Sequence, residues 1–111
     1  MSTAKILYAE LSEPGLNEKA YENALVIELG KRGHRVEQQK QFDVLYEGQI
    51  VDKLIPDLII NDQVVVDPKV VEEFGPTHVS QMIGYLAITN LRLALLLNFK
   101  HNDLRWKRIV R

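Results

Sequence analysis

The sequence contains no cysteine and a single tryptophan, and its apolar runs are all short. The absence of cysteine excludes disulfides and thiolate metal sites. A membrane-spanning helix needs about 20 consecutive apolar residues, and no run approaches that length. The first residues, MSTAKILYAELSEPG, lack the long apolar stretch of a signal peptide. We therefore expect a cytoplasmic protein with no membrane segment.

Neither sign of charge dominates the chain. It has 14 Lys and Arg against 15 Asp and Glu, which gives a net charge of -1. That balance argues against indiscriminate binding of polyanions but leaves room for a local basic patch. The length of 111 residues fits a single domain with one core, so we expect residues 1–111 to form one domain.

Helical and extended patterns alternate along the chain. Residues 16–32 carry apolar residues at helical spacing and stop at Gly33, which predicts a helix after a short helical or irregular lead-in at 6–11. A second helix is predicted from a Thr77 N-cap to about Thr89. Extended segments are predicted at 35–39, 42–46, 50–60, 64–71, 91–99 and 103–111. The order of helix, three or four strands, helix and two strands indicates a mixed α/β fold.

Charged residues interrupt the apolar stretch IPDLIINDQVVVDPKV, residues 55–70. If residues 61–63 form a three-residue turn, Asp57 lies opposite Asp67, and Lys69 follows on the same face. A two-residue turn would instead make the aspartates diagonal. With the three-residue turn, the opposite face of the hairpin is apolar and is the expected core face: Leu58, Ile60, Val64 and Val66.

Two opposed carboxylates repel unless a cation lies between them. Lys69 can supply that charge, and so can Mg²⁺, which takes one or two carboxylates and keeps several waters. Such a metal lowers the pKa of bound water and stabilises charge on a phosphoryl oxygen. The alternative is a structural ion pair on a solvated sheet face.

Two motifs carry a resemblance to known nucleases. PDL at 56–58 followed by DPK at 67–69 resembles the PD-(D/E)XK pattern of the restriction-endonuclease-like superfamily. GLNEKAY at 15–21 resembles the motif of the GxxExxY proteins, a small bacterial and archaeal branch of that superfamily. The segments that follow, ENALVIELGKRG, THVSQMIGYLAITNLRLALLLNF and KRIV, are also similar to that family, so the resemblance extends from Gly15 to the C-terminus.

The resemblance implies a fold, a reaction and a set of site residues. The fold is a restriction-endonuclease-like core, a mixed central β-sheet flanked by helices in αβββαββ order. The reaction is metal-dependent hydrolysis of phosphodiester bonds in DNA, with Mg²⁺ or alternatively Mn²⁺. Lys69 would assist the attacking water, and Gln81 would support the site. The implied metal ligands are Asp57, Asp67 and Glu18.

Several of these positions have ordinary structural explanations. Glu18 lies in a first helical turn, where the helix dipole favours any carboxylate, and Glu28 is another acidic candidate on that helix. Gln81 shares a helical stripe with His78 and Tyr85, and such a polar stripe is usually a solvated face.

The chain also departs from the pattern of its relatives, which generally show glutamate, a large apolar residue and lysine where Asp67, Pro68 and Lys69 stand. Pro68 removes a ladder donor and is disfavoured in a central strand. It indicates a strand end, a bulge or a site that has lost activity. The alternative function is therefore a catalytically degraded nuclease fold that acts as a nucleic-acid-binding or regulatory module.

The C-terminal segment is locally basic. It sets five cations against Asp103, and Trp106 could either stack on a base or belong to the core. A core this small leaves little surface for gripping a duplex, so we expect nucleic acid, in particular DNA, to be bound with the help of a homodimer or a larger partner. The cations are Lys100, Arg105, Lys107, Arg108 and Arg111.

Overall fold

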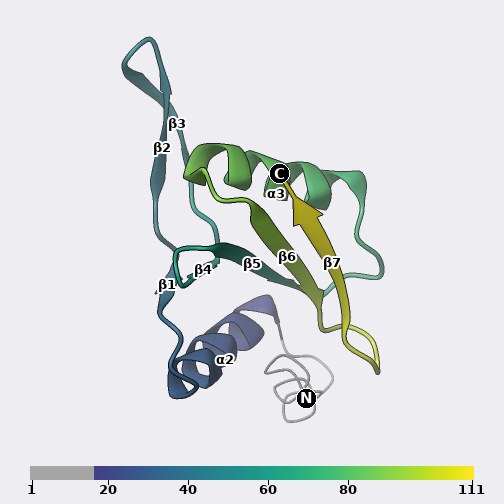
Figure 1. Ribbon diagram of the computed structural model, residues 1–111. Coiled ribbons are helices and arrows are strands. Elements are labelled where there is room, and N and C mark those ends of the chain that lie inside the picture. Colours follow the sequence, from purple (N-terminus) through teal and green to yellow (C-terminus); the bar gives the residue numbers. More distant parts are fainter. Residues whose placement is uncertain (1–16) are drawn as a thin grey trace.

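The computed structural model describes residues 17–111, so the predicted lead-in at 6–11 lies outside the described residues. A five-stranded sheet in the order β1-β4-β5-β6-β7 lies between two helices, and a separate β2–β3 hairpin projects from it (Figure 1). The predicted mixed central sheet flanked by helices is confirmed. The elements are α2 (Glu18–Lys31), β1 (Val36–Gln38), β2 (Phe42–Tyr46), β3 (Gln49–Leu54), β4 (Leu58–Ile60), β5 (Val64–Lys69), α3 (Pro76–Thr89), β6 (Leu93–Asn98) and β7 (Arg105–Val110).

Helix α2 covers one face of the sheet. It begins where Asn17 Oδ1 accepts a hydrogen bond from Ala20 N at 3.2 Å, as a good N-cap does. Its apolar side packs Tyr21 and Leu25 against the sheet, and the Tyr21 ring stacks on Phe99 with centroids 4.5 Å apart. The other buried members of this cluster are Leu58, Ile60, Val66 and Leu97.

Helix α3 covers the opposite face and packs Met82, Tyr85 and Leu86 against β5, β6 and β7. It links β5 to β6, which run parallel, as a crossover connection does. Its N-cap is Gly75, so the prediction of Thr77 as N-cap is wrong. Pro76 suits the first helical position, and His78 Nδ1 accepts the Gly75 N–H at 3.0 Å. Between residues 17 and 111 no helix is long and apolar enough to cross a membrane.

The β4–β5 hairpin has the three-residue turn predicted for it. Ile60 pairs with Val64 and Leu58 with Val66, and turn residues Asn61 and Asp62 take positive φ values of 52° and 58°. The face with Leu58 is core under α2, as predicted. The other face is not open to solvent, because Val65 is 0% exposed in the cluster under α3. The alternative of an ion pair on a solvated face therefore does not apply here: Asp67 does pair with Lys69, but the Asp67 side chain is only 2% exposed.

The extended segment predicted at 50–60 is divided into two strands in different sheets. β3 pairs only with β2 in the hairpin, whereas β4 joins the main sheet between β1 and β5. The two strands are separated at residues 55–57, where the buried Pro56 cannot donate to a ladder. This division lets β1 pair with β4 across the whole inserted hairpin.

Pro68 is accommodated inside β5 without loss of a ladder bond. Lys69 O accepts the N–H of Phe99 at 2.9 Å, so the backbone groups of Lys69 point toward β6 and those of Pro68 point away from it. On that other side β4 has ended, since its last pair with β5 is Leu58 with Val66. The register continued by two residues places Pro56 opposite Pro68. Neither proline can donate a backbone hydrogen bond. The β4–β5 pairing therefore ends at Leu58 and Val66, immediately before the two aspartates.

Candidate active site

Asp57 and Asp67 meet where the β4–β5 pairing ends. Asp57 immediately precedes β4, Asp67 lies within β5, and the two side chains are close enough for Asp67 to raise the pKa of Asp57. Asp67 is only 2% exposed. Its Oδ2 lies 3.2 Å from Lys69 Nζ in an ion pair, but among residues 17–111 that oxygen accepts no hydrogen bond of good geometry. The predicted convergence of the two carboxylates with the lysine is present in the structure.

The environment of Asp57 favours its protonated form. Burial raises the pKa of Asp57 to about 8, and the hydrogen bond and charge of Asp67 and the charge of Glu22 act in the same direction. A hydrogen bond from Gln39 opposes the shift. Without an added cation, the aspartate pair therefore retains a proton near neutral pH.

This pKa makes the stability of the metal-free protein pH-dependent. The ordinary pKa of Asp57 is 3.8 and its folded value is about 8, so between these values the native state binds more protons than the unfolded chain. The free energy of unfolding should then fall as pH rises from about 4 to about 8, by at most about 1.4 kcal/mol per pH unit for one proton. Urea unfolding in EDTA across this range should give a steeper fall for wild type than for Asp57→Asn. Equal slopes would contradict the assignment.

Lys69 is held from the side of α3. Its Nζ donates to Gln81 Oε1 at 3.4 Å, and Gln81 Nε2 donates to the hydroxyl of Tyr85 at 2.9 Å. Burial, followed by the charges of Asp67 and Asp57, raises the pKa of Tyr85. The structure therefore brings Gln81 to the aspartate pair through the lysine, and the polar stripe on α3 is more than a solvated face.

Glu18 lies apart from the aspartate pair. Its Oε2 accepts the N–H of Val70 at 3.2 Å, just beyond the end of β5. Glu28 is also elsewhere, in ion pairs with Lys31 at 3.7 Å and Arg32 at 3.4 Å near the end of α2. Among the described residues, neither carboxylate forms a hydrogen bond or an ion pair with the aspartates or with Lys69.

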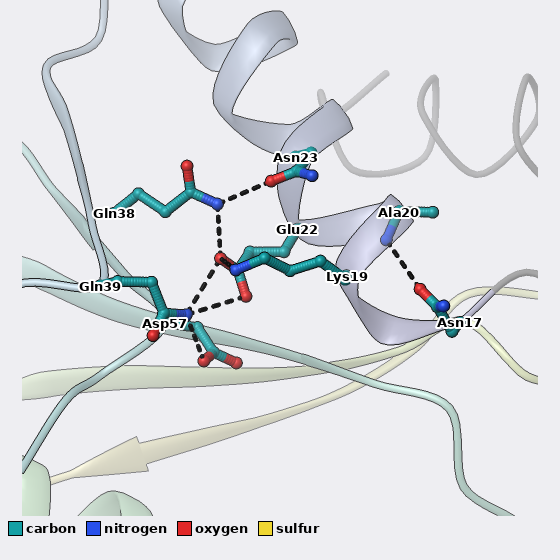
Figure 2. Close-up of polar contacts among 8 residues, drawn as sticks. All are labelled: Asn17, Lys19, Ala20, Glu22, Asn23, Gln38, Gln39 and Asp57. Atoms are coloured by element: carbon teal, nitrogen blue, oxygen red, sulfur yellow. Dashed lines mark hydrogen bonds and ion pairs between the residues drawn. The ribbon is translucent and has the colours of Figure 1, made fainter.

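Glu22 is the helical acid that connects to the site, and it is not among the residues predicted from the sequence. It is 4% exposed and pairs with Lys19 at 3.0 Å. Gln39 Nε2 donates to Glu22 Oε2 at 3.1 Å and also to Asp57 Oδ1 at 3.1 Å, which links the two acids (Figure 2). The sequence did contain a signal for Glu22: it lies four residues after Glu18 and so on the same face of the helix, which makes it a second acidic candidate on that face.

The aspartate pair fits a hard divalent cation that takes only one or two of its ligands from the protein. Mg²⁺ accepts one or two carboxylates and fills its remaining positions with water or substrate oxygens. Asp67 also offers a buried oxygen that accepts no hydrogen bond of good geometry in the described part of the chain. Within residues 17–111 no group of three His, Cys, Asp or Glu side chains is arranged to hold a metal by itself. The fit therefore rests on Asp57 and Asp67.

Solved structures share this fold at low sequence identity. The crystal structure of SSO0001 superposes with a TM-score of 0.63 and 17% identity over 85% of this chain and 48% of that chain. An alkaline exonuclease from Laribacter hongkongensis, LHK-Exo, gives 0.61 and 15% identity over 98% of this chain and 67% of that chain. LHK-Exo in complex with dAMP gives 0.64, with the same identity and coverage. The chain thus spans about half the length of SSO0001 and about two thirds of the exonuclease.

No curated protein matches the chain significantly. A family model described as the PD-(D/E)XK nuclease superfamily matches residues 2–109, almost the full length. This match includes both aspartates and Lys69, whose convergence the structure shows independently of the motif. The chain belongs to the PD-(D/E)XK nuclease superfamily.

Proposed function

We propose that this domain hydrolyses phosphodiester bonds in DNA with the help of Mg²⁺ or Mn²⁺. The observation that carries the proposal is the proximity of Asp57 to Asp67, whose buried Oδ2 forms an ion pair with Lys69 but accepts no hydrogen bond of good geometry among the described residues. Membership in a nuclease superfamily and a fold shared with an alkaline exonuclease support the same reaction class.

Each side chain has a proposed role. Asp57 and Asp67 would hold the cation, which when bound supplies an acidified water and stabilises charge on the phosphoryl group. Lys69 lies close enough to the pair to orient the attacking water or to offset negative charge that develops on the phosphate. Gln81 accepts a hydrogen bond from Lys69 and so holds the ammonium in place.

The experiment that tests this function is cleavage of labelled linear DNA by the purified protein, with Mg²⁺ or with EDTA. We expect cleavage only with the metal, and loss of cleavage in Asp67→Asn, which keeps the side-chain shape but removes its charge. Cleavage that persists in EDTA or in Asp67→Asn would contradict the proposal.

The helical acid that serves the site is open to a direct test. The sequence points to Glu18, but the contact through Gln39 favours Glu22. We expect Glu22→Gln to lower the rate of DNA cleavage about 10- to 100-fold, as loss of a supporting carboxylate does. Glu18→Gln keeps an acceptor for Val70 N and should change the rate by no more than about twofold. The reverse order of effects would restore Glu18 as the site residue.

The nucleic acid would approach along the α3 side of the sheet. Asp67 pairs with Leu96, and Leu96 pairs with Lys107, so these residues form one row on one face. Two strand spacings separate Asp67 from Lys107, about 10 Å. Lys69 pairs with Asn98, and Asn98 pairs with Arg105, so Arg105 lies in a neighbouring row on the same face. Lys107 and Arg105 are both exposed. They are the proposed contacts to backbone phosphates.

A degraded nuclease fold is the second candidate function. Lys69 already pairs with Asp67, and within the described residues the acidic side chains form no three-ligand metal group. Such a domain would bind DNA without cutting it and act as a nucleic-acid-binding or regulatory module. Retention of intact DNA in a gel-shift assay with Mg²⁺ present, without any cleavage, would favour this candidate.

Finer assignments follow from the sequence. We propose membership of the GxxExxY branch, in which Glu18 and Tyr21 of the motif would anchor α2 through Val70 N and the ring of Phe99. We also propose a cytoplasmic location and a homodimer or a larger partner that completes the DNA-binding surface. The molar mass in solution, with and without DNA, tests the homodimer.

A further inference from the structure

Gln39 has an unusual backbone and lies beside the aspartates. Its φ is 57°, in the left-handed region that residues other than glycine seldom adopt. Its N–H donates to Asp57 O at 3.0 Å, which continues the β1–β4 ladder by one residue beyond the pair of Gln38 with Leu58. If both registers are continued by one residue, Gln39 lies next to Asp57 and Asp57 next to Asp67, just beyond the ends of β1 and β4.

The side chain of Gln39 also turns toward the site. Its Nε2 lies 3.1 Å from Asp57 Oδ1, and 3.2 Å and 3.1 Å from the two oxygens of Glu22 (Figure 2). A glutamine amide carries two N–H donors, so a single group can supply one hydrogen bond to each carboxylate. Gln39 is thus the direct link between an acid of α2 and the acid that precedes β4.

The donor at this position is neutral. An amide orients carboxylates without cancelling their charge, whereas a lysine or arginine would occupy the place of a cation. Gln38, next in the chain, also donates to Glu22 but turns its second contact toward Asn23 and not toward Asp57. The two adjacent glutamines are therefore a natural comparison, since only Gln39 bridges to the aspartate pair.

We propose that Gln39 is a positioning residue for the metal site, because its amide fixes Asp57 and Glu22 relative to each other and places no positive charge of its own beside Asp57. This role rests on the proposed function. It adds a residue that lies outside both sequence motifs. It also offers a reason for the left-handed backbone conformation of Gln39. Partners of metal ligands typically alter metal affinity about 10- to 100-fold when they are removed.

The test is calorimetric titration of Mn²⁺ into four proteins at one pH. Gln39→Gly removes the amide and tolerates the positive φ, so it separates the side chain from the backbone. Gln39→Lys places an ammonium between the acids, and Gln38→Ala is the matched control. Thermal unfolding of each metal-free protein reports folding separately from metal binding.

We expect Gln39→Gly to bind Mn²⁺ about 10- to 100-fold more weakly than wild type, and Gln38→Ala to differ by about twofold at most. Gln39→Lys should also bind Mn²⁺ more weakly, while its metal-free unfolding temperature is unchanged or raised. Wild-type affinity in Gln39→Gly, or an equal loss in Gln38→Ala, would overturn the positioning role with the proposed function intact. Absence of saturable Mn²⁺ binding in wild type would overturn the proposed function itself and this role with it.

Discussion

Replacement of Lys69 by alanine should lower the rate of Mg²⁺-dependent DNA cleavage by about 100- to 1,000-fold, the usual effect of removing one charge-stabilising group from a reaction centre. The Lys69 side chain is only 14% exposed, and its Nζ is 3.2 Å from the buried oxygen of Asp67. Among residues 17–111, no other Lys, Arg or His forms an ion pair with that oxygen. Initial rates of cleavage of a labelled linear duplex provide the measurement.

The Lys69 test needs variants that separate chemistry from folding. Removal of one partner of a buried ion pair typically costs about 3–5 kcal/mol, and the partial exposure of Lys69 reduces that cost here. Lys69→Met keeps the packed stem and should lose activity to the same extent as Lys69→Ala. Lys53→Ala removes a lysine from strand β3 of the projecting hairpin and should keep the wild-type rate. Undiminished cleavage by both Lys69 variants would place the activity outside this site.

Asp57→Asn should have opposite effects on metal binding and on stability. We expect Mn²⁺ affinity to fall by about 100-fold or more, because one of only two fitting carboxylates is lost. The metal-free protein should instead become more stable at pH 8, where wild type must either keep Asp57 protonated far above its ordinary pKa of 3.8 or hold two charges close together. Solvent reaches part of Asp57, so we expect a gain on the order of 1–3 kcal/mol.

Calorimetry and urea unfolding in EDTA at pH 8 measure these two effects on the same variant. Asp62→Asn is the control, since Asp62 lies in the β4–β5 turn and its side chain is 64% exposed. Asparagine tolerates the positive φ of that position, so this control should leave both quantities near wild type. If Asp57→Asn lowers stability and retains metal affinity, Asp57 is a structural residue.

The hairpin at the site could be predicted from sequence because two local rules agree there. Side chains alternate between faces of a strand, and the polar turn at 61–63 fixes which residues oppose each other. Counting residues outward from the turn therefore predicted that Asp57, Asp67 and Lys69 share one face. It did not predict that α3 buries this face over Val65, because that packing depends on the β5–α3–β6 crossover, which residue spacing does not specify.

The contacts of Gln39 and Glu22 were beyond sequence reasoning for a topological reason. β1 skips the whole β2–β3 hairpin to pair with β4, and this nonlocal pairing brings Gln39 to Asp57, 18 residues later. Glu22 then joins through Gln39 from α2. The difficulty raised by Pro68 also disappears only in three dimensions, since its missing N–H faces the side on which β4 has already ended.

We propose that the Asp57–Asp67 pair and Lys69 cleave DNA with a divalent cation. The most direct test is cleavage of end-labelled linear DNA by wild type and by Asp67→Asn, prepared identically, in Mg²⁺, in Mn²⁺ and in EDTA. We predict cleavage by wild type with a metal but not in EDTA, and none by Asp67→Asn under any condition. Equal cleavage by the two proteins, or intact DNA with wild type in both Mg²⁺ and Mn²⁺, would contradict the claim.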